Sequence, residues 1–257
     1  KMLDISIINA LSDNYIYLLR NEKKNITSVI DPGKAEPVIK FLNSKNWHLD
    51  EIINTHHHND HIGANLELKN ITNCKIIGPK SDFERIPGID ICYKDKDEFS
   101  FGNETVRVMD IPGHTKGHIA FYFNKSQALF CGDTLFALGC GRVFEGTMEQ
   151  MWDSLVKIKN LPKETKVYCA HEYTLSNGNF ALTIEPENQK LKIRMNEVIL
   201  KREKGISTVP SILLDEIETN PFLRPDSIEI QKKLSLVGSS DLEVFTKIRL
   251  LKDSFRG

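Results

Sequence analysis

The residues best suited to chemistry form one short run, Thr55-His56-His57-His58-Asn59-Asp60-His61. Four histidines and one aspartate fall within seven residues, directly after an apolar segment that reads as a buried strand. Side chains alternate along extended backbone, so His56 and His58 face the same way and can bind one metal ion. Asp60 and His61 lie further along the turn and can reach a second ion. Imidazole and carboxylate ligands without thiolate are typical of catalytic zinc, iron or manganese rather than of a closed structural zinc site.

Three more segments end in residues that can bind a metal. His114, Asp133 and His171 each lie just past a short predicted strand. A single histidine or a Gly-Asp pair is more often a turn cap or a buried polar residue. Their recurrence at the same kind of position, however, indicates a site built along one sheet edge.

The other polar residues of this region are expected to support the ligands rather than to bind metal. His57 alternates away from His56 and His58, so it should pack or hydrogen-bond behind them. His118 begins a predicted strand, and we expect it to be structural. Asp31 ends a strand near the same edge, where it either orients a ligand imidazole or caps a turn.

Short strands and connecting helices must hold these side chains in place. Strands are predicted over 3–8, 15–20, 26–30, 51–54, 74–78, 104–110, 119–123, 127–131 and 167–169. Helices are predicted around Val38–Leu42, with its apolar stripe, and from about Met148. Strand, helix and strand in succession predict a layered α/β arrangement.

Helical patterns take over in the last third of the chain. One helix is predicted over 187–204, with Leu191, Met195, Val198 and Ile199 on one face, and shorter helices are predicted after it. For the last helix, Ser240 and Glu243 have the spacing of a capping box. We therefore expect a catalytic domain over 1–174 and a helical substrate-binding domain over 175–257.

The composition excludes several classes of protein. The chain has 257 residues, of which 40% are hydrophobic and 27% charged, as in ordinary globular proteins. A net charge of -1 argues against nucleic acid as an obligate partner. No apolar run approaches the ~20 residues of a transmembrane helix, so neither a membrane partner nor a secretory leader is expected. The five cysteines show no CxxC pairing, which favours a reduced, cytoplasmic setting. Cys140 and Cys169 lie close in sequence to site residues, but a ligand set without thiols gives them no required role, so we expect both to be structural. We also expect a monomer.

The His-x-His-x-Asp-His pattern within Thr55–His61 resembles the signature of the metallo-β-lactamase fold superfamily. Within that superfamily, the whole chain is similar to the glyoxalase II (hydroxyacylglutathione hydrolase) family. Besides the histidine run, the resemblance rests on segments 113–118, 131–136, 139–142, 171–174 and 220–224 and on the final helix. It implies an αββα sandwich of two mixed sheets followed by a C-terminal helical domain.

The resemblance also implies a centre that holds two metal ions. His56, His58 and His114 would bind the first ion, Asp60, His61 and His171 the second, and Asp133 would bridge the two. Zinc is expected in both positions, with iron or manganese as alternatives. Two ions ~3.5–4 Å apart lower the pKa of a shared water from about 15.7 toward ~7. The resulting hydroxide, held by the ions that Asp60 and Asp133 bind, is the expected nucleophile.

The resemblance further implies a small-molecule substrate, a glutathione thioester. S-D-lactoylglutathione is the expected form, cleaved to D-lactate, a 2-hydroxy acid, and glutathione. In the family, an arginine and a lysine matching Arg249 and Lys252 hold the glycine carboxylate of glutathione, and residues matching Tyr173 and Arg142 make further contacts. Phe144 departs from members with a tyrosine at this position, which removes one hydrogen bond worth ~1 kcal/mol.

Three other functions compete with this one. A persulfide dioxygenase of the same superfamily would use one iron and O₂, but the basic pair on the last helix and the complete second ligand set argue against it. An RNA-processing nuclease would need a basic surface, which the sequence does not show. A non-enzymatic metal-binding protein would have no need of seven ligands.

Overall fold

The computed structural model describes residues 3–257, which form two compact units. Unit 1 comprises residues 3–110 and 116–132, and unit 2 comprises residues 111–115 and 133–257. The domain boundary predicted after residue 174 stays a prediction.

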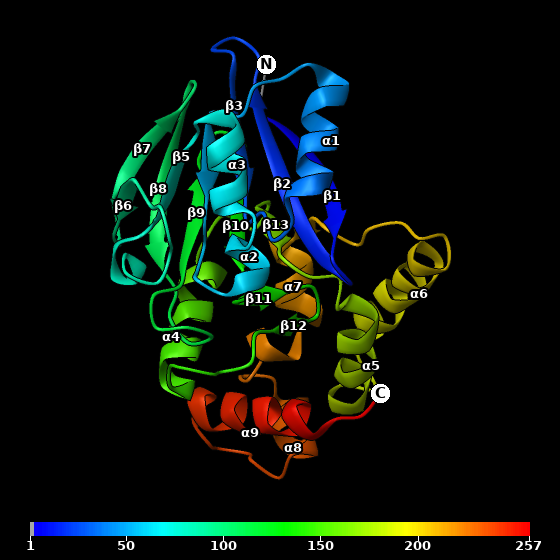
Figure 1. The fold of residues 1–257 in the computed structure, drawn as a ribbon. Coiled ribbons are helices and arrows are strands. Elements are labelled where there is room, and N and C mark those ends of the chain that lie inside the picture. The colour runs from blue at the N-terminus through cyan, green and yellow to red at the C-terminus, as the bar shows by residue number, and fades with distance from the viewer. Residues whose placement is uncertain (1–2) are drawn as a thin grey trace. The chain divides into compact units, whose positions relative to one another are not determined.

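Unit 1 contains a sheet of six strands in the order β1-β2-β3-β4-β5-β6 (Figure 1). The strands are β1 (Asp4–Ala10), β2 (Asn14–Asn21), β3 (Ile26–Ile30), β4 (Glu51–Ile53), β5 (Lys75–Pro79) and β6 (Ile91–Tyr93). The first three strands pair antiparallel, whereas β3 to β6 pair in parallel. Because parallel strands end at the same edge, the segments that leave β3 and β4 start side by side.

Helices cover one face of this sheet (Figure 1). They are α1 (Ala35–Lys45) and α3 (Asn65–Thr72), with the short α2 (Asn59–Ile62) between them in the chain and the 3₁₀ turn η1 (Lys80–Asp82) after β5. Alternate residues of the strands point to this face, so that Ile16 and Leu18 of β2 share one core with Val38 of α1 and Leu68 of α3.

A second, antiparallel set of strands lies against the other face. It contains β7 (Glu98–Phe101), β8 (Glu104–Asp110), β9 (Ile119–Phe123) and β10 (Ala128–Gly132). Tyr17, which alternates with Ile16 and Leu18, meets Phe130 of β10 edge to face, with ring centroids 5.4 Å apart. Unit 1 therefore has helix, sheet and sheet layers, as the α/β class predicts.

Unit 2 is mainly helical. Its elements are β11 (Leu135–Phe136), β12 (Gly139–Cys140), α4 (Met148–Lys159), β13 (Lys166–Cys169), α5 (Thr174–Ile184), α6 (Gln189–Glu203), β14 (Ser211–Ile212), α7 (Leu213–Thr219), the 3₁₀ turn η2 (Pro221–Leu223), α8 (Ile228–Lys233) and α9 (Asp241–Ser254). The predicted capping box of the last helix is confirmed, because the Ser240 side chain accepts from the Glu243 N–H and the Glu243 carboxylate accepts from the Ser240 N–H. Phe222 of η2 packs between Phe180 of α5 and Phe245 of α9.

No helix in residues 3–257 is both long enough and apolar enough to cross a membrane.

Candidate metal centre

The histidine run leaves β4 at the edge where β3 also ends, and Asp31 anchors it there. The Asp31 carboxylate accepts hydrogen bonds from the Thr55 N–H (2.8 Å) and the Thr55 hydroxyl (2.6 Å). It also lies 2.9 Å from Nδ1 of His61. Asp31 itself has a positive φ of 51°, which turns the chain sharply after β3. Of the two roles predicted for Asp31, the structure therefore supports the orientation of a ligand imidazole.

The four predicted ligands of unit 1 lie in two close pairs. Nε2 of His56 and Nδ1 of His58 are 3.2 Å apart, and Nε2 of His61 and the Asp60 carboxylate are also 3.2 Å apart. His56 and His61 are fully buried, so they cannot be ordinary surface histidines. Nδ1 of His56 lies 3.0 Å from the Thr55 hydroxyl, which leaves Nε2 as its ligand atom.

Asp60 is held by a residue from a distant strand. The Asn14 side-chain amide at the start of β2 donates to the Asp60 carboxylate (3.0 Å) and to the Asp60 carbonyl (3.3 Å). Asn14 and Asp60 are 46 positions apart in the sequence. The residues around Asn14 therefore give no sign of this contact and mark Asn14 only as a turn residue. Such long-range support leaves no local pattern.

His57 contacts Asp82 and Arg85, in agreement with its prediction as a packing or hydrogen-bonding residue, and His118 packs on a predicted ligand. Nδ1 of His57 lies 3.4 Å from the buried Asp82 carboxylate, and Nε2 lies 3.3 Å from the Arg85 guanidinium. Arg85 in turn binds Asp82 through two nitrogens. The His118 ring stacks on the ring of His56 with centroids 4.5 Å apart, which fixes the plane of that ligand.

In unit 2, the other two predicted histidine ligands both lie beside the Asp133 carboxylate. Nε2 of His114 lies 3.3 Å from one oxygen of Asp133, and Nε2 of His171 lies 3.3 Å from the other oxygen. All three side chains are buried. Each oxygen of the buried Asp133 carboxylate therefore faces the imidazole of one predicted ligand.

The loop around β12 fixes the orientation of His114. Nδ1 of His114 lies 2.8 Å from the carbonyl oxygen of Arg142, so this nitrogen carries the proton and Nε2 keeps its lone pair. The loop packs so closely that a side chain at Gly141 would collide with the Asp133 carbonyl oxygen. The Gly141 N–H also donates to the Thr134 carbonyl (3.0 Å).

Buried polar side chains from the helical part of unit 2 form hydrogen bonds to the turn between β11 and β12. The Leu138 N–H donates to the Glu216 carboxylate of α7 (2.9 Å), and the Asn220 amide donates to the Gly139 carbonyl (3.0 Å). Arg194 of α6 pairs with the same Glu216 carboxylate, which neutralises a fully buried charge. The segment 220–224, which contributes to the family resemblance, therefore has a structural role here.

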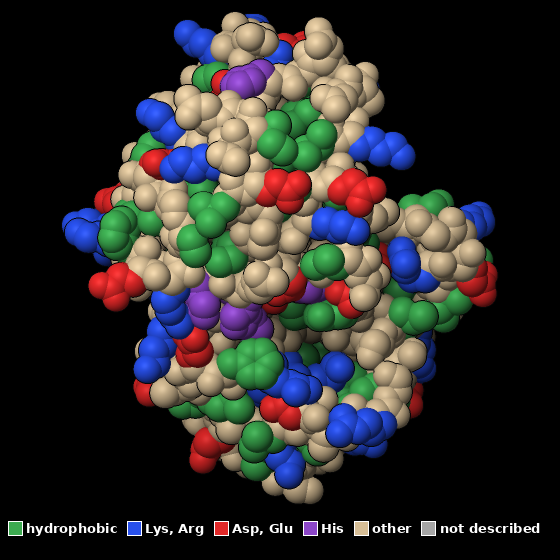
Figure 2. Space-filling model, in the orientation of Figure 1, with side chains coloured by type: hydrophobic (Ala, Val, Ile, Leu, Met, Phe, Trp, Pro, Cys, Tyr) green, Lys and Arg blue, Asp and Glu red, His purple; other side chains and the backbone are tan. Residues whose placement is uncertain are grey.

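The spacing of the ligand atoms fits a divalent metal ion. Neighbouring ligands of a tetrahedral zinc ion with bonds of about 2.0–2.1 Å lie about 3.3 Å apart. The pairs His56/His58, Asp60/His61, His114/Asp133 and His171/Asp133 lie 3.2–3.3 Å apart. Several histidine side chains reach the surface as a group on the face shown in Figure 2. Imidazole and carboxylate together suit zinc, iron or manganese.

The predicted substrate residues all lie in unit 2. The Tyr173 ring stacks on the His171 ring with centroids 4.7 Å apart, and the Phe144 ring meets the His114 ring at 5.2 Å. Both aromatic side chains are partly exposed, at 38% and 61%, so each can contact a ligand. The Arg142 guanidinium lies 6.0 Å above the Phe144 ring.

Three of the predicted substrate residues are cations near the Asp253 carboxylate, and we call them the basic group: Arg142, Arg249 and Lys252. Asp253 lies 2.9 Å from Arg249 and 3.4 Å from Arg142. Burial lowers the pKa of Lys252, and the charges of Arg249 and Arg142 lower it further. One carboxylate does not balance three cations, so this part of the surface attracts anions. Arg249 differs from the others because it is only 4% exposed.

The five cysteines are free thiols, and two of them lie beside site residues. Burial raises the pKa of Cys140 to about 11 and that of Cys169 to about 12. Both thiols are therefore protonated at neutral pH and are poor nucleophiles and poor metal ligands. The structural role predicted for both agrees with this.

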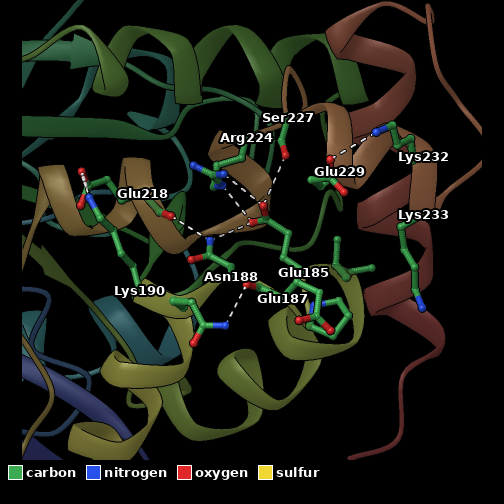
Figure 3. Close-up of a pocket in the computed structure, with 13 residues that line it drawn as sticks. Glu185, Glu187, Asn188, Lys190, Glu218, Arg224, Ser227, Glu229, Lys232 and Lys233 are labelled. Carbon is green, nitrogen blue, oxygen red and sulfur yellow. Dashed lines mark hydrogen bonds and ion pairs between the residues drawn. The ribbon is translucent and has the colours of Figure 1, made fainter.

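A separate hollow of about 770 Å³ lies among α5, α6, α7 and α8 of unit 2 (Figure 3). It contains none of the predicted site residues. Its lining includes four acidic and four basic side chains, and six of these eight pair as Glu185 with Arg224, Glu218 with Lys190, and Glu229 with Lys232. Because these charges neutralise one another, the hollow offers little attraction to an ionic ligand.

Two families of known proteins match the chain. A family profile described as "Metallo-beta-lactamase superfamily" matches residues 11–171, and one described as "Hydroxyacylglutathione hydrolase C-terminus" matches residues 172–255. A relative named hydroxyacylglutathione hydrolase, from Methylococcus capsulatus, is 54% identical over 256 residues, which is 100% of both chains. Another of the same name, from Rhodospirillum rubrum, is 51% identical over 98% of this chain and 99% of its own.

Solved structures agree in fold. A structure described as BLEG-1 B3 metallo-beta-lactamase has a TM-score of 0.66 at 22% identity and covers 86% of this chain and 100% of its own. ETHE1 from Myxococcus xanthus also has a TM-score of 0.66, at 21% identity, over 97% of each chain. The chain therefore belongs to the metallo-β-lactamase superfamily and, within it, to the hydroxyacylglutathione hydrolase family of enzymes.

Proposed function

We propose that this enzyme hydrolyses S-2-hydroxyacylglutathione thioesters, with S-D-lactoylglutathione as its substrate, to a 2-hydroxy acid and glutathione. The observation that carries this proposal is the identity of about half of all residues, over the full length of both chains, to relatives named hydroxyacylglutathione hydrolase. The ligand geometry and the basic group around Asp253 support it.

The proposed cofactors are two divalent ions, with zinc first and iron or manganese as alternatives. His56, His58 and His114 would hold the first ion, Asp60, His61 and His171 the second, and Asp133 both. The donor chemistry and the 3.2–3.3 Å spacing of ligand pairs within each unit support this assignment. When bound, the ions would supply a water of lowered pKa and polarise the thioester carbonyl.

The residues of the chain prepare this chemistry by fixing protons on particular nitrogens. Asp31 beside Nδ1 of His61 and the Arg142 carbonyl beside Nδ1 of His114 hold the protons there. The opposite nitrogen of each ring then keeps its lone pair in a fixed direction. Ligands that are oriented in advance need not reorganise during the reaction.

A thioester suits this apparatus because its thiolate leaves without a strong general acid. The partly exposed Tyr173 and Phe144 rings would flank the substrate beside His171 and His114. Arg249 and Lys252 would attract the glycine carboxylate of the glutathione moiety, and Arg142 would make a further contact with it. Phe144 has no hydroxyl, so it would contribute apolar contact where a tyrosine would add a hydrogen bond.

The test is thiol release from S-D-lactoylglutathione, compared with the D-lactoyl thioester of coenzyme A. We expect the glutathione thioester to react at least about tenfold faster, because the coenzyme lacks the carboxylates that the basic group would bind. Asp133→Ala should abolish thiol release and reduce the metal content of the purified protein. Equal rates on both thioesters would contradict the proposed substrate class, and oxygen uptake with a persulfide in place of thiol release would overturn the reaction.

A further inference from the structure

The segment that follows β13 carries two predicted site residues with a carboxylate between them. The rings of His171 and Tyr173 stack, with centroids 4.7 Å apart and planes only 3° apart. Glu172 lies between them in the chain, and its side chain contacts a different part of unit 2. This side chain is 9% exposed, so it places a nearly buried charge that the protein must compensate.

Glu172 is compensated by the chain at the end of α6 and just after it. Its carboxylate accepts hydrogen bonds from the Thr208 N–H (2.8 Å) and from the Thr208 hydroxyl, which lies 2.9 and 2.8 Å from the two oxygens. Nη1 of Arg202 lies 3.3 Å from the same carboxylate and donates to the Ile206 carbonyl (2.9 Å). Both backbone and side-chain groups of residues 202–208 therefore fix the Glu172 side chain.

The Thr208 hydroxyl continues this network to the first residue of α5. It lies 2.6 Å from the Thr174 hydroxyl, and both threonines are buried. Because the Thr208 hydroxyl gives its one proton to the carboxylate, the Thr174 hydroxyl must donate to Thr208. Glu172 and Thr174 thus hold the chain on both sides of Tyr173, and a shift of Tyr173 or of His171 would strain these bonds.

We propose that Glu172 is a positioning residue that holds the metal ligand His171 and the substrate-contacting Tyr173 in place, with Thr208 as its main partner. This inference rests on the proposed function, in which His171 binds only the second ion and Tyr173 contacts the glutathione moiety. In this role Glu172 binds neither ion nor substrate, and it acts by fixing the backbone next to both residues. Its loss should therefore weaken the second ion and substrate binding together, while the first ion stays bound.

The hydrogen-bonding capacity of the side chain separates this role from one of charge alone. The amide of Glu172→Gln can still accept from the Thr208 N–H, and its NH₂ group can donate to the Thr208 hydroxyl, which then donates to Thr174. Glu172→Ala removes all of these contacts, and the Arg202 side chain, which is 31% exposed, can turn to solvent. Glutamine should thus preserve the positioning that alanine abolishes.

The experiment compares Glu172→Ala, Glu172→Gln and Thr208→Val, using the full chain loaded with zinc and labelled with ¹⁵N-histidine. Glu203→Ala is the matched control, because Glu203 is an exposed glutamate at the end of α6. A chelator is added in steps, and the imidazole signals of His114 and His171 report the first and the second ion. The kcat and KM for thiol release and the midpoint of urea unfolding are measured in parallel.

We expect Glu172→Ala to bind the second zinc ion about 10–100-fold more weakly, as is typical when a group behind a metal ligand is lost. The zinc-bound signal of His171 should disappear at a chelator concentration that leaves the His114 signal unchanged. KM should rise about three- to tenfold, which corresponds to one misplaced aromatic contact. Thr208→Val keeps the backbone N–H and should show a smaller change of the same kind, whereas Glu172→Gln and Glu203→Ala should resemble the unaltered protein.

Three results would overturn the inference. The first is a folded Glu172→Ala variant with unchanged second-ion affinity and KM, in which only the urea midpoint falls. The second is equal weakening of both ions, which would mean a general loosening of the fold. The third is a Glu172→Gln variant as impaired as Glu172→Ala, which would assign the effect to charge.

Should Glu172→Ala not fold, Thr208→Val decides, and unchanged second-ion affinity in that variant would overturn the inference. Failure of the unaltered protein to release thiol would contradict the proposed function instead, because the competition with chelator is measured without substrate.

Discussion

The most informative single residue outside the ligands is Asp31. The sequence places it at a strand end, where turn capping and ligand support are equally expected, and only the structure distinguishes them. The Asp31 carboxylate accepts two hydrogen bonds from Thr55 and lies beside Nδ1 of His61. One side chain therefore holds both the start of the histidine run and its last predicted ligand. Residues of this kind escape sequence patterns because an aspartate at a strand end has many ordinary uses.

Replacement of Asp31 by asparagine should weaken metal binding without changing any ligand. The amide keeps one oxygen, but its NH₂ group faces donors at Thr55 or His61. We expect the dissociation constant for zinc to rise about 10–100-fold, measured by competition with a chelator. Asp226→Asn is the control, because Asp226 is exposed. Unchanged zinc affinity in Asp31→Asn would show that His61 needs no carboxylate behind it.

A second residue, Glu51, should make stability depend on pH. Burial raises the pKa of its carboxyl above the usual 4.5, although the hydrogen bond from Ser28 opposes this shift. The folded chain therefore holds this proton to higher pH than the unfolded chain does. The contribution of Glu51 to the free energy of unfolding is largest below pH 4.5 and is lost as the pH rises through the raised pKa.

Glu51→Gln should consequently be more stable than the unaltered protein near pH 7 and should differ little from it where Glu51 is protonated. The amide oxygen can still accept from Ser28, and no charge is buried. Urea unfolding at several pH values measures the difference, with the exposed Glu164→Gln as control. A difference that does not change between pH 4 and 7 would contradict a titration of Glu51 as the cause.

At the scale of elements, strands were easier to predict than helices. The bounds 26–30, 104–110 and 119–123 agree with β3, β8 and β9, because alternating or continuous apolar residues end at clear turn residues. The sequence periodicity also places Ile199 on the inward face of α6, which is wrong, since this side chain is 39% exposed. Leu191, Met195 and Val198 alone form the buried stripe.

Helix α5 has no strong signal in the sequence. Its serine, asparagine and glycine residues have low helix propensity. It is stabilised instead by packing, and Gly178 lies so close to the Met195 side chain of α6 that a larger residue would force that side chain to move. Tertiary contacts of this kind cannot be read from a local window.

The capping box of α9 allows a test of how much the start of one helix contributes to the free energy of unfolding. Ser240→Ala removes the acceptor for the Glu243 N–H at the start of this helix. We expect a loss of about 1 kcal/mol in the free energy of unfolding, measured by urea denaturation. Ser239→Ala is the neighbouring control, and equal stability of the two variants would mean that packing of Val244 and Ile248 already fixes the helix start.

At the scale of the whole molecule, the seven predicted ligands are distributed over both compact units. His56, His58, Asp60 and His61 lie in unit 1, and His114, Asp133 and His171 lie in unit 2. Sequence patterns propose all seven because each follows a short strand and lies in a segment that resembles a family motif. The residues behind them, such as Asn14 and Asp82, come from elsewhere in the chain and have no motif of their own.

Nδ1 of His114 donates to a backbone carbonyl, that of Arg142, and this affects which substitutions the enzyme can tolerate. A carbonyl oxygen is present whichever amino acid occupies position 142, so natural drift or laboratory mutagenesis can vary that side chain while the imidazole keeps its partner. Under the proposed function, selectivity toward a new thiol and retention of the metal would thus be separable at a single position, which makes 142 a suitable first site for redesign.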